Sequence, residues 1–508
     1  MRPVTTAALG ICVLFLSAAP TIHAESDAWL PASLATWVDG MELFHSGRPD
    51  EGLEWILERR RERPEDPCGY FFEATAYADY DVGDLSRDER AERNRDLIEK
   101  GLKMLERPGD DAAARYCRAA LYGRRSRERL ERNSYLAGAY DAKRMRKQMR
   151  ALIADHPEFS DCRFWLGAYD YYADVIPTYI KFFRTLLFLP KGDRERGIEQ
   201  LEEASRHGVL ERYNAHWTLH DAYGIEKRTS DQREVLERFR VAFPDDVSVV
   251  MQLAWDLFGE RPPARERAVA LHREAMEHLE GAQGSHVPRL VFRLSHSLGR
   301  LHLRDVEPQA AVDVLTTAIE SARGRERDEL AVAGTLARAL IQTGDHAAAT
   351  ALFESLSQRY PDADDLSDVR QRVREFDDRT SRLDADMLPA LRLVRDLKTE
   401  EAEQAFRELL ERHPADPYIY FRWAEMYFTE NRYVAAESLY RKIVDAGPAK
   451  PDFLMPGATL RLGQVYDVTD RRREAKSSYR RVREIAGDYD GIVRAAGFFL
   501  DNAYSKPN

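Results

Sequence analysis

The sequence predicts an all-α protein in which pairs of helices recur along the chain. A pattern of large apolar residues interspersed with Ala or Gly returns at a spacing of roughly thirty-four residues. The chain is rich in Ala, Leu, Arg and Glu, and it has few stretches in which Val, Ile or Thr alternate with polar residues, which favours helix over strand. Proline closes several of the predicted second helices, because it cannot continue the helical hydrogen-bond ladder.

The clearest copy of the pattern runs from Tyr420 to Pro448, and further copies cover 337–361 and 462–482. Large apolar residues fill the predicted seam between the helices, and Ala or Gly stands where the two backbones approach most closely. In the clearest copy these residues are Tyr420, Trp423, Ala424, Tyr427, Ala436, Tyr440 and Ile443. They resemble the tetratricopeptide repeat family. The resemblance implies a helix-pair solenoid with a right-handed superhelix that serves as a binding scaffold.

The N-terminal third is predicted to be irregular. Its expected elements are, in order, a helix pair over 40–64, a helix from Ala74, a helix over 95–105, two long basic helices over 112–132 and 135–155, a helix from Leu166, a hydrophobic insertion over 175–190 and a delayed partner helix from Gly197.

The rest of the chain continues the pairs. Weaker copies are expected over 219–244, 253–268 and 298–315, and stronger ones over 337–361, 390–414, 420–448 and 462–482. A last helix over 491–503 would cap the stack, as an open-ended solenoid requires. The polar stretch 377–386 is the predicted joint. The expected division is a leader over 1–24, a divergent region over 25–205, central repeats over 206–375 and C-terminal repeats over 387–508.

The N-terminus resembles a secretory signal peptide cut near Ala24. Arg2 precedes a largely apolar stretch over 4–19, and small residues then lead to the acidic Glu25. A retained membrane anchor is the alternative, although the apolar run is short for a bilayer span. We expect an exported protein. Region 112–204 resembles exported bacterial tetratricopeptide proteins, and this resemblance implies the periplasm.

Three cysteines would remain after cleavage, Cys68, Cys117 and Cys162. The odd number leaves at least one unpaired or bonded to another chain. Each lies on a predicted helix beside aromatic residues, so buried thiols are the preferred interpretation and a disulfide is the alternative.

The insertion is a candidate membrane-contact helix. Lys181 and Arg184 share one helical face there, with Phe182 and Phe183 on the remainder, as in helices that lie in a membrane interface. The alternative is that this helix fills the inner curve of the solenoid. The surrounding region 112–204 resembles exported bacterial tetratricopeptide proteins of unassigned function, and 177–197 is faintly similar to the eukaryotic tetratricopeptide repeat 39 family, which implies association with membrane or lipid surfaces.

A basic block covers residues 115–150, with Arg124 and Arg144 among its cations and few opposing acids. Such a block would attract anionic lipid or an acidic protein. The alternative is an ordinary solvated surface that acidic neighbours, such as those in 199–203, neutralise.

The resemblance also implies a concave binding surface lined by the first helix of each pair. Carried over to this chain, the groove positions are Trp217, Arg293, His296, Arg300, Tyr418, Phe421, Glu425 and Phe428. Aromatic and Arg side chains dominate many interfaces, so a protein or peptide partner is expected in this groove. The alternative is that Phe421 and Phe428 pack on neighbouring repeats.

Signals for catalysis are weak. His216 and His220 have the spacing of a metal-binding pair, but no Glu follows His216 and no third ligand can be named. No nucleotide-binding glycine loop or nucleophile-elbow motif occurs, and no cofactor is expected. The net charge of −11 argues against general affinity for nucleic acid. The sequence therefore favours an exported scaffold that binds a protein or peptide in cell-envelope assembly or maintenance, with a peripheral lipid-binding factor as the first alternative and an enzyme as the second.

Overall fold

The computed structural model describes residues 29–505, except 67, 84, 107–110, 176–190, 261–263, 283, 285, 362, 364–365 and 488. The expected leader and the four insertion residues Lys181, Phe182, Phe183 and Arg184 lie outside this described part. All regular elements within it are helices, as the sequence predicts. None of the described helices is long and apolar enough to cross a membrane.

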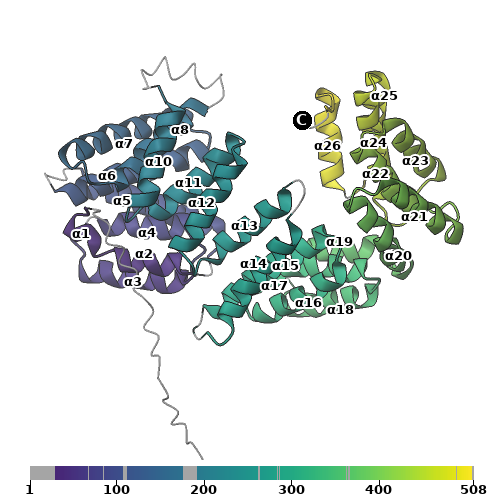
Figure 1. The fold of residues 1–508 in the computed structure, drawn as a ribbon, viewed down its shortest axis with the longest axis horizontal. Coiled ribbons are helices and arrows are strands. Elements are labelled where there is room, and N and C mark those ends of the chain that lie inside the picture. The colour runs from purple at the N-terminus through teal and green to yellow at the C-terminus, as the bar shows by residue number, and fades with distance from the viewer. Residues whose placement is uncertain are drawn as a thin grey trace, which may run out of the picture. The chain divides into compact units, whose positions relative to one another are not determined.

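The chain folds as two compact units, residues 1–235 and 236–508 (Figure 1). Both consist of helix pairs stacked on helix pairs, so the predicted all-α helical-repeat architecture is confirmed. The polar stretch 377–386 lies inside the second unit, where it forms the start of a helix.

The first unit begins with short helices and continues with long ones. Its helices are α1 (Ala32–Ala35), α2 (Val38–His45), α3 (Pro49–Glu62), α4 (Cys68–Asp79), α5 (Arg87–Met104), α6 (Ala112–Glu131), α7 (Tyr135–Asp155), α8 (Asp161–Val175), α10 (Arg194–His207), α11 (Arg212–Ile225) and α12 (Thr229–Ala242), the last of which contains the boundary between the units. The start of α6 is fixed by Asp111, whose side chain accepts a hydrogen bond from the backbone N–H of Ala114. Aromatic rings fill the core, as where Trp37 stacks on Phe72 with centroids 5.0 Å apart.

The pair formed by α8 and α10 closes across the undescribed insertion. Gly167 and Gly197 face each other there, and a Cβ on Gly197 would lie 2.7 Å from the backbone nitrogen of Tyr171 and 3.0 Å from the carbonyl oxygen of Gly167. Beside this crossing, the backbone N–H of Asp193 donates to the carbonyl of Asp170 at 2.8 Å. The predicted delayed helix from Gly197 is therefore the partner of the helix from Leu166.

Two of the three cysteines in the described part of the chain form a disulfide. Cys68 on α4 and Cys117 on α6 are bonded, with Cα atoms 5.5 Å apart. The preferred expectation of buried thiols is wrong for this pair, because packing of α4 on α6 brings together two positions separated by 49 residues. Cys162 is a buried free thiol, which confirms the expected unpaired cysteine.

The second unit is the more regular one. Its helices after α12 are α13 (Val247–Gly259), α14 (Arg265–Leu279), α15 (Val287–Arg304), α16 (Pro308–Ser321), α17 (Glu326–Gln342), α18 (His346–Arg359), α19 (Ser367–Glu375), α20 (Asp378–Arg395), α21 (Thr399–Arg412), α22 (Pro417–Thr429), α23 (Tyr433–Ala446), α24 (Leu454–Val468), α25 (Arg472–Ile485) and α26 (Asp490–Asp501). The predicted seam residues Trp423, Tyr440 and Tyr479 are buried. Helix α26 packs on α24 and α25 and is the predicted cap.

Candidate ligand-binding pocket

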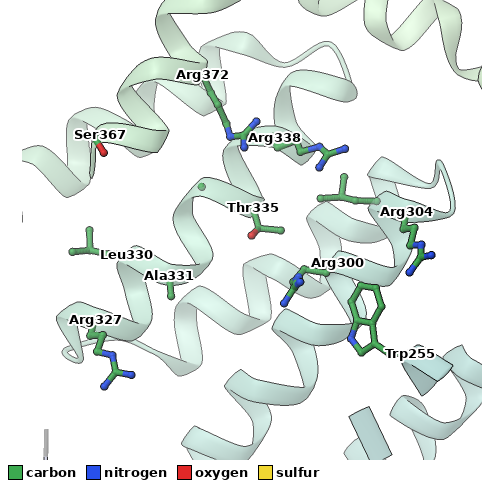
Figure 2. A pocket seen from close by; sticks show the side chains of 12 residues that line it. Trp255, Arg300, Arg304, Arg327, Leu330, Ala331, Thr335, Arg338, Ser367 and Arg372 are labelled. Carbon is green, nitrogen blue, oxygen red and sulfur yellow. The ribbon is translucent and has the colours of Figure 1, made fainter. Parts of the chain in front are cut away.

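A pocket of about 800 Å³ lies in the second unit, lined by side chains of α13, α15, α17 and α19 (Figure 2). Three of these helices, α13, α15 and α17, are the first helices of successive pairs. Neighbouring pairs bring them side by side, since α15 packs against both α13 and α17. The pocket therefore lies on the surface that a helix-pair stack offers to an extended ligand.

Arginine dominates the lining. The five arginines are Arg300 and Arg304 from α15, Arg327 and Arg338 from α17, and Arg372 from α19. Arg327 and Arg338 lie about three turns apart, which places them on one face of α17. No Asp or Glu occurs among the described residues that line the pocket.

Trp255 forms the apolar wall. The guanidinium carbons of Arg300 and Arg304 lie 5.1 and 5.7 Å from the centroid of its ring, within the range of a cation–π contact. The indole N–H of Trp255 donates to the hydroxyl of Ser297 at 3.2 Å, and this hydroxyl also lies 3.0 Å from Nε2 of His272. These contacts fix the ring, which lies in the pocket lining beside Arg300 and Arg304 (Figure 2).

The positive charge at the pocket is poorly compensated. Within the described part of the chain, Arg300, Arg304, Arg338 and Arg372 form no ion pair. Burial lowers the pKa of Arg338, and the nearby cations Arg372 and Arg422 lower it further. Figure 2 shows Arg338 and Arg372 at the same end of the pocket. Because these two cations disfavour each other's charge, a bound anion would stabilise both.

One acid that acts on the pocket cation Arg338 is itself already hydrogen-bonded. Asp384 on α20 is buried, and the hydroxyl of Tyr418 donates to its Oδ1 at 2.9 Å. Burial raises the pKa of Asp384, while the Arg422 cation acts against that shift. The charge of Asp384 acts on the interior Arg422 and, to a smaller extent, on the pocket cation Arg338.

Tetratricopeptide repeat family models match two stretches of the second unit, residues 335–363 and 390–451. The chain contains tetratricopeptide repeats. The first match includes Thr335 and Arg338 of the pocket. No curated protein matches the chain.

Several solved structures match the chain at low sequence identity and low TM-score. A tetratricopeptide repeat protein from Parabacteroides merdae is 12% identical, with 57% of this chain and 98% of that chain covered and a TM-score of 0.26. The apo quorum sensor NprR of B. thuringiensis is 11% identical, with coverage of 84% and 99% and a TM-score of 0.32. A human IFIT1 dimer with PPP-AAAA is 15% identical, with coverage of 89% and 90% and a TM-score of 0.32.

The groove residues predicted in α15 lie at or beside the pocket. Arg300 lines it directly. Nε2 of His296 lies 3.1 Å from the hydroxyl of Thr335, which is also part of the lining. Burial and the Arg300 cation lower the pKa of His296 to about 4, so this imidazole adds no charge at neutral pH. Arg293 donates to the hydroxyl of Ser248 at 2.8 Å and supports α13 against α15.

The groove residues predicted in the C-terminal repeat are engaged in packing. Tyr418 and Phe428 are buried. The ring of Phe421 lies against Phe453, with centroids 5.6 Å apart. Glu425 forms an ion pair with Arg461 at 2.7 Å. These contacts match the alternative reading, in which such side chains hold neighbouring repeats together.

The remaining candidates lie in the first unit. Trp217 on α11 is half-buried, with its ring edge-on to His220 at 6.0 Å. Arg124 is buried and paired with Asp79 at 2.9 Å, so it lies beneath the surface of the predicted basic block. Arg144 on α7 is exposed and stacks on Tyr140 at 4.4 Å.

The basic block is largely neutralised by carboxylates. Arg125 and Arg129 both pair with Asp141, at 2.9 and 2.6 Å. Arg115 pairs with Asp155 at 2.7 Å, and Arg146 with Asp170 at 3.3 Å. The expected neutralisation does occur, but through residues of α4 to α8 rather than mainly through the acidic run 199–203.

The two histidines with metal-binding spacing are engaged elsewhere. Nδ1 of His216 lies 2.8 Å from the carbonyl of Arg212, and Nε2 of His220 lies 3.1 Å from the side-chain amide of Gln232. Among the described residues, no three His, Cys, Asp or Glu side chains are arranged to hold a metal ion.

Sequence reasoning missed four principal pocket residues, Trp255, Arg304, Arg338 and Arg372. A signal for three of them was present, because Trp255, Arg304 and Arg338 lie on the same face of first helices as Arg300. Applying the groove positions to the copies over 253–268 and 337–361 would have found Trp255 and Arg338. Arg372 lies on α19, which the repeat pattern does not include.

Proposed function

We propose that this chain is an exported tetratricopeptide repeat scaffold that holds an acidic segment of a partner protein in the arginine pocket. The observation that carries the proposal is the set of four pocket arginines that have no ion-pair partner among the described residues, namely Arg300, Arg304, Arg338 and Arg372. A carboxylate placed there would gain charge-assisted hydrogen bonds with each planar guanidinium it reaches. The role is binding rather than catalysis.

The shape of the site supports an extended peptide. Adjacent helices pack about 8–10 Å apart, so a ligand that crosses α13, α15 and α17 spans about 20 Å. An extended chain covers about 3.4 Å per residue, which gives a segment of about six residues. Trp255 would take an apolar or aromatic side chain of that segment, and the arginines would take its Asp, Glu or terminal carboxylate.

The charge of the whole chain favours a protein partner over nucleic acid. The net charge of −11 repels a polyphosphate backbone at a distance, whereas a short acidic segment within a mixed-charge protein carries far less repulsion. Tighter binding of a nucleic acid than of an acidic peptide would therefore overturn the proposal.

Binding of defined probes tests the pocket. Fluorescence anisotropy would compare a labelled peptide of alternating Glu and Leu with a matched Lys–Leu peptide and with a single-stranded RNA oligonucleotide. The variant carries Arg300→Gln with Arg338→Gln. A hydrogen bond to a charged group contributes about 1.5–3 kcal/mol. The double variant is therefore expected to bind the acidic peptide with an affinity at least about 100-fold lower than that of the wild type.

A matched control makes the same change in charge elsewhere in the second unit. Arg323 and Arg412 are exposed and form no ion pair with any described residue, so Arg323→Gln with Arg412→Gln tests general electrostatics. The proposal expects this control to bind the acidic peptide within a factor of about two of wild type. Equal loss in both variants, or tighter binding of the RNA than of the peptide, would overturn it.

Export rests on two independent features. Residues 1–24 have the charge, apolar run and small-residue end of a cleaved leader. The Cys68–Cys117 disulfide is of the kind that persists in oxidising compartments. We place the scaffold in the bacterial periplasm, in envelope assembly or maintenance. Mass spectrometry of the protein from its native cells should give an N-terminus near Glu25, and an intact Met1 would contradict export by cleavage.

A further inference from the structure

Helix α7 has an outer face that no other described element covers. It is 21 residues long and packs on α6 and α8 through its inner face (Figure 1). Met145, Met149 and Leu152 are buried on that inner face. On the outer side, Leu136 is 53% exposed and Tyr140 is 54% exposed. Two large apolar side chains one turn apart are thus open to the surroundings.

More apolar surface adjoins this first part of α7. Tyr135 and, at the end of α6, Leu130 are also exposed large hydrophobic residues. Leu130 lies beside the helix, since a Cβ on Gly138 would meet its side chain at 2.9 Å. Leu130 therefore packs against the inner face of α7, and the large apolar side chains exposed on the outer face are Leu136 and Tyr140.

The second half of the outer face is cationic. Lys147 and Arg150 are exposed, Lys143 is half-buried, and Arg144 lies over the Tyr140 ring. None of these four forms an ion pair with a described residue. They differ in this respect from most arginines of α6, which are paired with carboxylates.

The two acids of α7 do not compensate these cations. Asp141 is 0% exposed and accepts hydrogen bonds from Arg125 and Arg129. Asp155 stands at the end of the helix and pairs with Arg115. The outer face consequently has apolar residues at one end, unpaired cations at the other and no available carboxylate between them.

We propose that this face of α7 docks the protein on an anionic phospholipid surface. A helix with exposed Leu and Tyr beside Lys and Arg matches the chemistry of a membrane interface, where the apolar side chains enter the acyl boundary and the cations meet phosphate headgroups. Tyrosine is favoured at that depth because its ring is apolar and its hydroxyl is polar. The long cationic side chains reach the headgroup layer from a helix lying in its plane. This surface is separate from the arginine pocket and does not depend on the function proposed for it.

Vesicle binding tests the proposal with the mature chain, residues 25–508. Sedimentation would compare vesicles of phosphatidylcholine alone with vesicles containing about one third phosphatidylglycerol. The first variant, Lys147→Gln with Arg150→Gln, is expected to lower the partition coefficient about 30-fold on the anionic vesicles at low salt. The second, Leu136→Ser, is expected to lower it about tenfold. Both changes lie on the surface, and the melting temperature checks that each variant is folded.

The control makes an equal change in charge on α25, where Arg480 and Arg483 are exposed and have no ion-pair partner among the described residues. Arg480→Gln with Arg483→Gln should bind anionic vesicles as the wild type does. Three results would overturn the proposal, namely no binding to anionic vesicles, full binding by both α7 variants, or equal loss in the α25 control. Full binding by both α7 variants would assign membrane contact to another part of the chain.

Discussion

Replacement of Gly197 by Ala tests the close crossing of α8 and α10 in the first unit. The added Cβ would lie 2.7 Å from the Tyr171 nitrogen and 3.0 Å from the Gly167 oxygen. Both neighbours are backbone atoms of α8, so neither can move by changing a rotamer. Relief requires α8 and α10 to separate by about 0.7 Å, and a gap of that size forfeits a quarter to a half of each contact energy along the crossing. We expect a net destabilisation of about 1–3 kcal/mol, even though Ala is the better helix former by about 1 kcal/mol.

Gly497 provides the matched control, because it is inside α26 and a Cβ there would meet nothing within 4 Å. Gly497→Ala should leave stability unchanged or raise it by up to about 1 kcal/mol. Urea unfolding followed by circular dichroism measures both variants against wild type. The reasoning fails if Gly197→Ala is as stable as wild type. It also fails if Gly497→Ala lowers the free energy of unfolding as much as Gly197→Ala does.

Three further predictions concern the first unit. Cys117→Ser removes the bond to Cys68, and for a separation of 49 residues the loop-entropy relation gives a loss of about 4 kcal/mol; a denaturation midpoint that does not change would contradict it. Asp141→Asn leaves two arginines without their buried partner and should cost about 3–5 kcal/mol in urea unfolding, whereas Asp96→Asn, at an exposed pair, should cost under about 1 kcal/mol. Burial raises the pKa of Glu211 to about 7, so its folded form binds a proton more tightly than the unfolded chain. The contribution of this proton to the free energy of unfolding is complete below about pH 4, and it is lost as the pH rises to about 7. Glu211→Gln should therefore flatten the decline in melting temperature between pH 4.5 and 7, and an unchanged slope would refute the assignment.

The repeat architecture was predictable because close packing restricts residue type. At Gly463, a Cβ would lie 2.3 Å from the Tyr479 ring. A small residue on the first helix of a pair is therefore needed wherever a large residue occupies the facing position on the second helix. Such mutual constraints generate the periodic pattern that the sequence shows. The same reasoning located Gly167 and Gly197 as partners across a long insertion.

The arginine pocket was only partly predictable. Arg300 follows from the groove positions of one repeat, and Trp255 and Arg338 follow from those of its neighbours, but the pocket also needs Arg372, which comes from α19 outside the repeat pattern. Which helices are neighbours is a property of the stack rather than of any single copy. The C-terminal aromatic residues show the converse, because Phe428 occupies a groove position and is nevertheless buried.

The pairing of side chains across the first unit could not be obtained from local spacing. The Cys68–Cys117 bond joins α4 to α6, and Asp79 of α4 neutralises Arg124 of α6. Both depend on a helix order that the irregular repeats of this region obscure. Consequently the sequence indicates a basic block over 115–150, while the structure leaves uncompensated cations chiefly on the outer face of α7.

The hydrogen bond between the backbones of Asp193 and Asp170 affects how much the length of the chain between α8 and α10 can vary. Helix α8 ends at Val175, and the start of α10 is held to it by the backbone N–H of Asp193 on the carbonyl of Asp170 and by Arg194 on Asp174, both at 2.8 Å. A segment whose two ends are fastened to each other can change in length at little entropic cost. The repeat pair thus offers an attachment point at which a chain segment can be exchanged, shortened or replaced by a foreign domain while the helices on either side keep their packing.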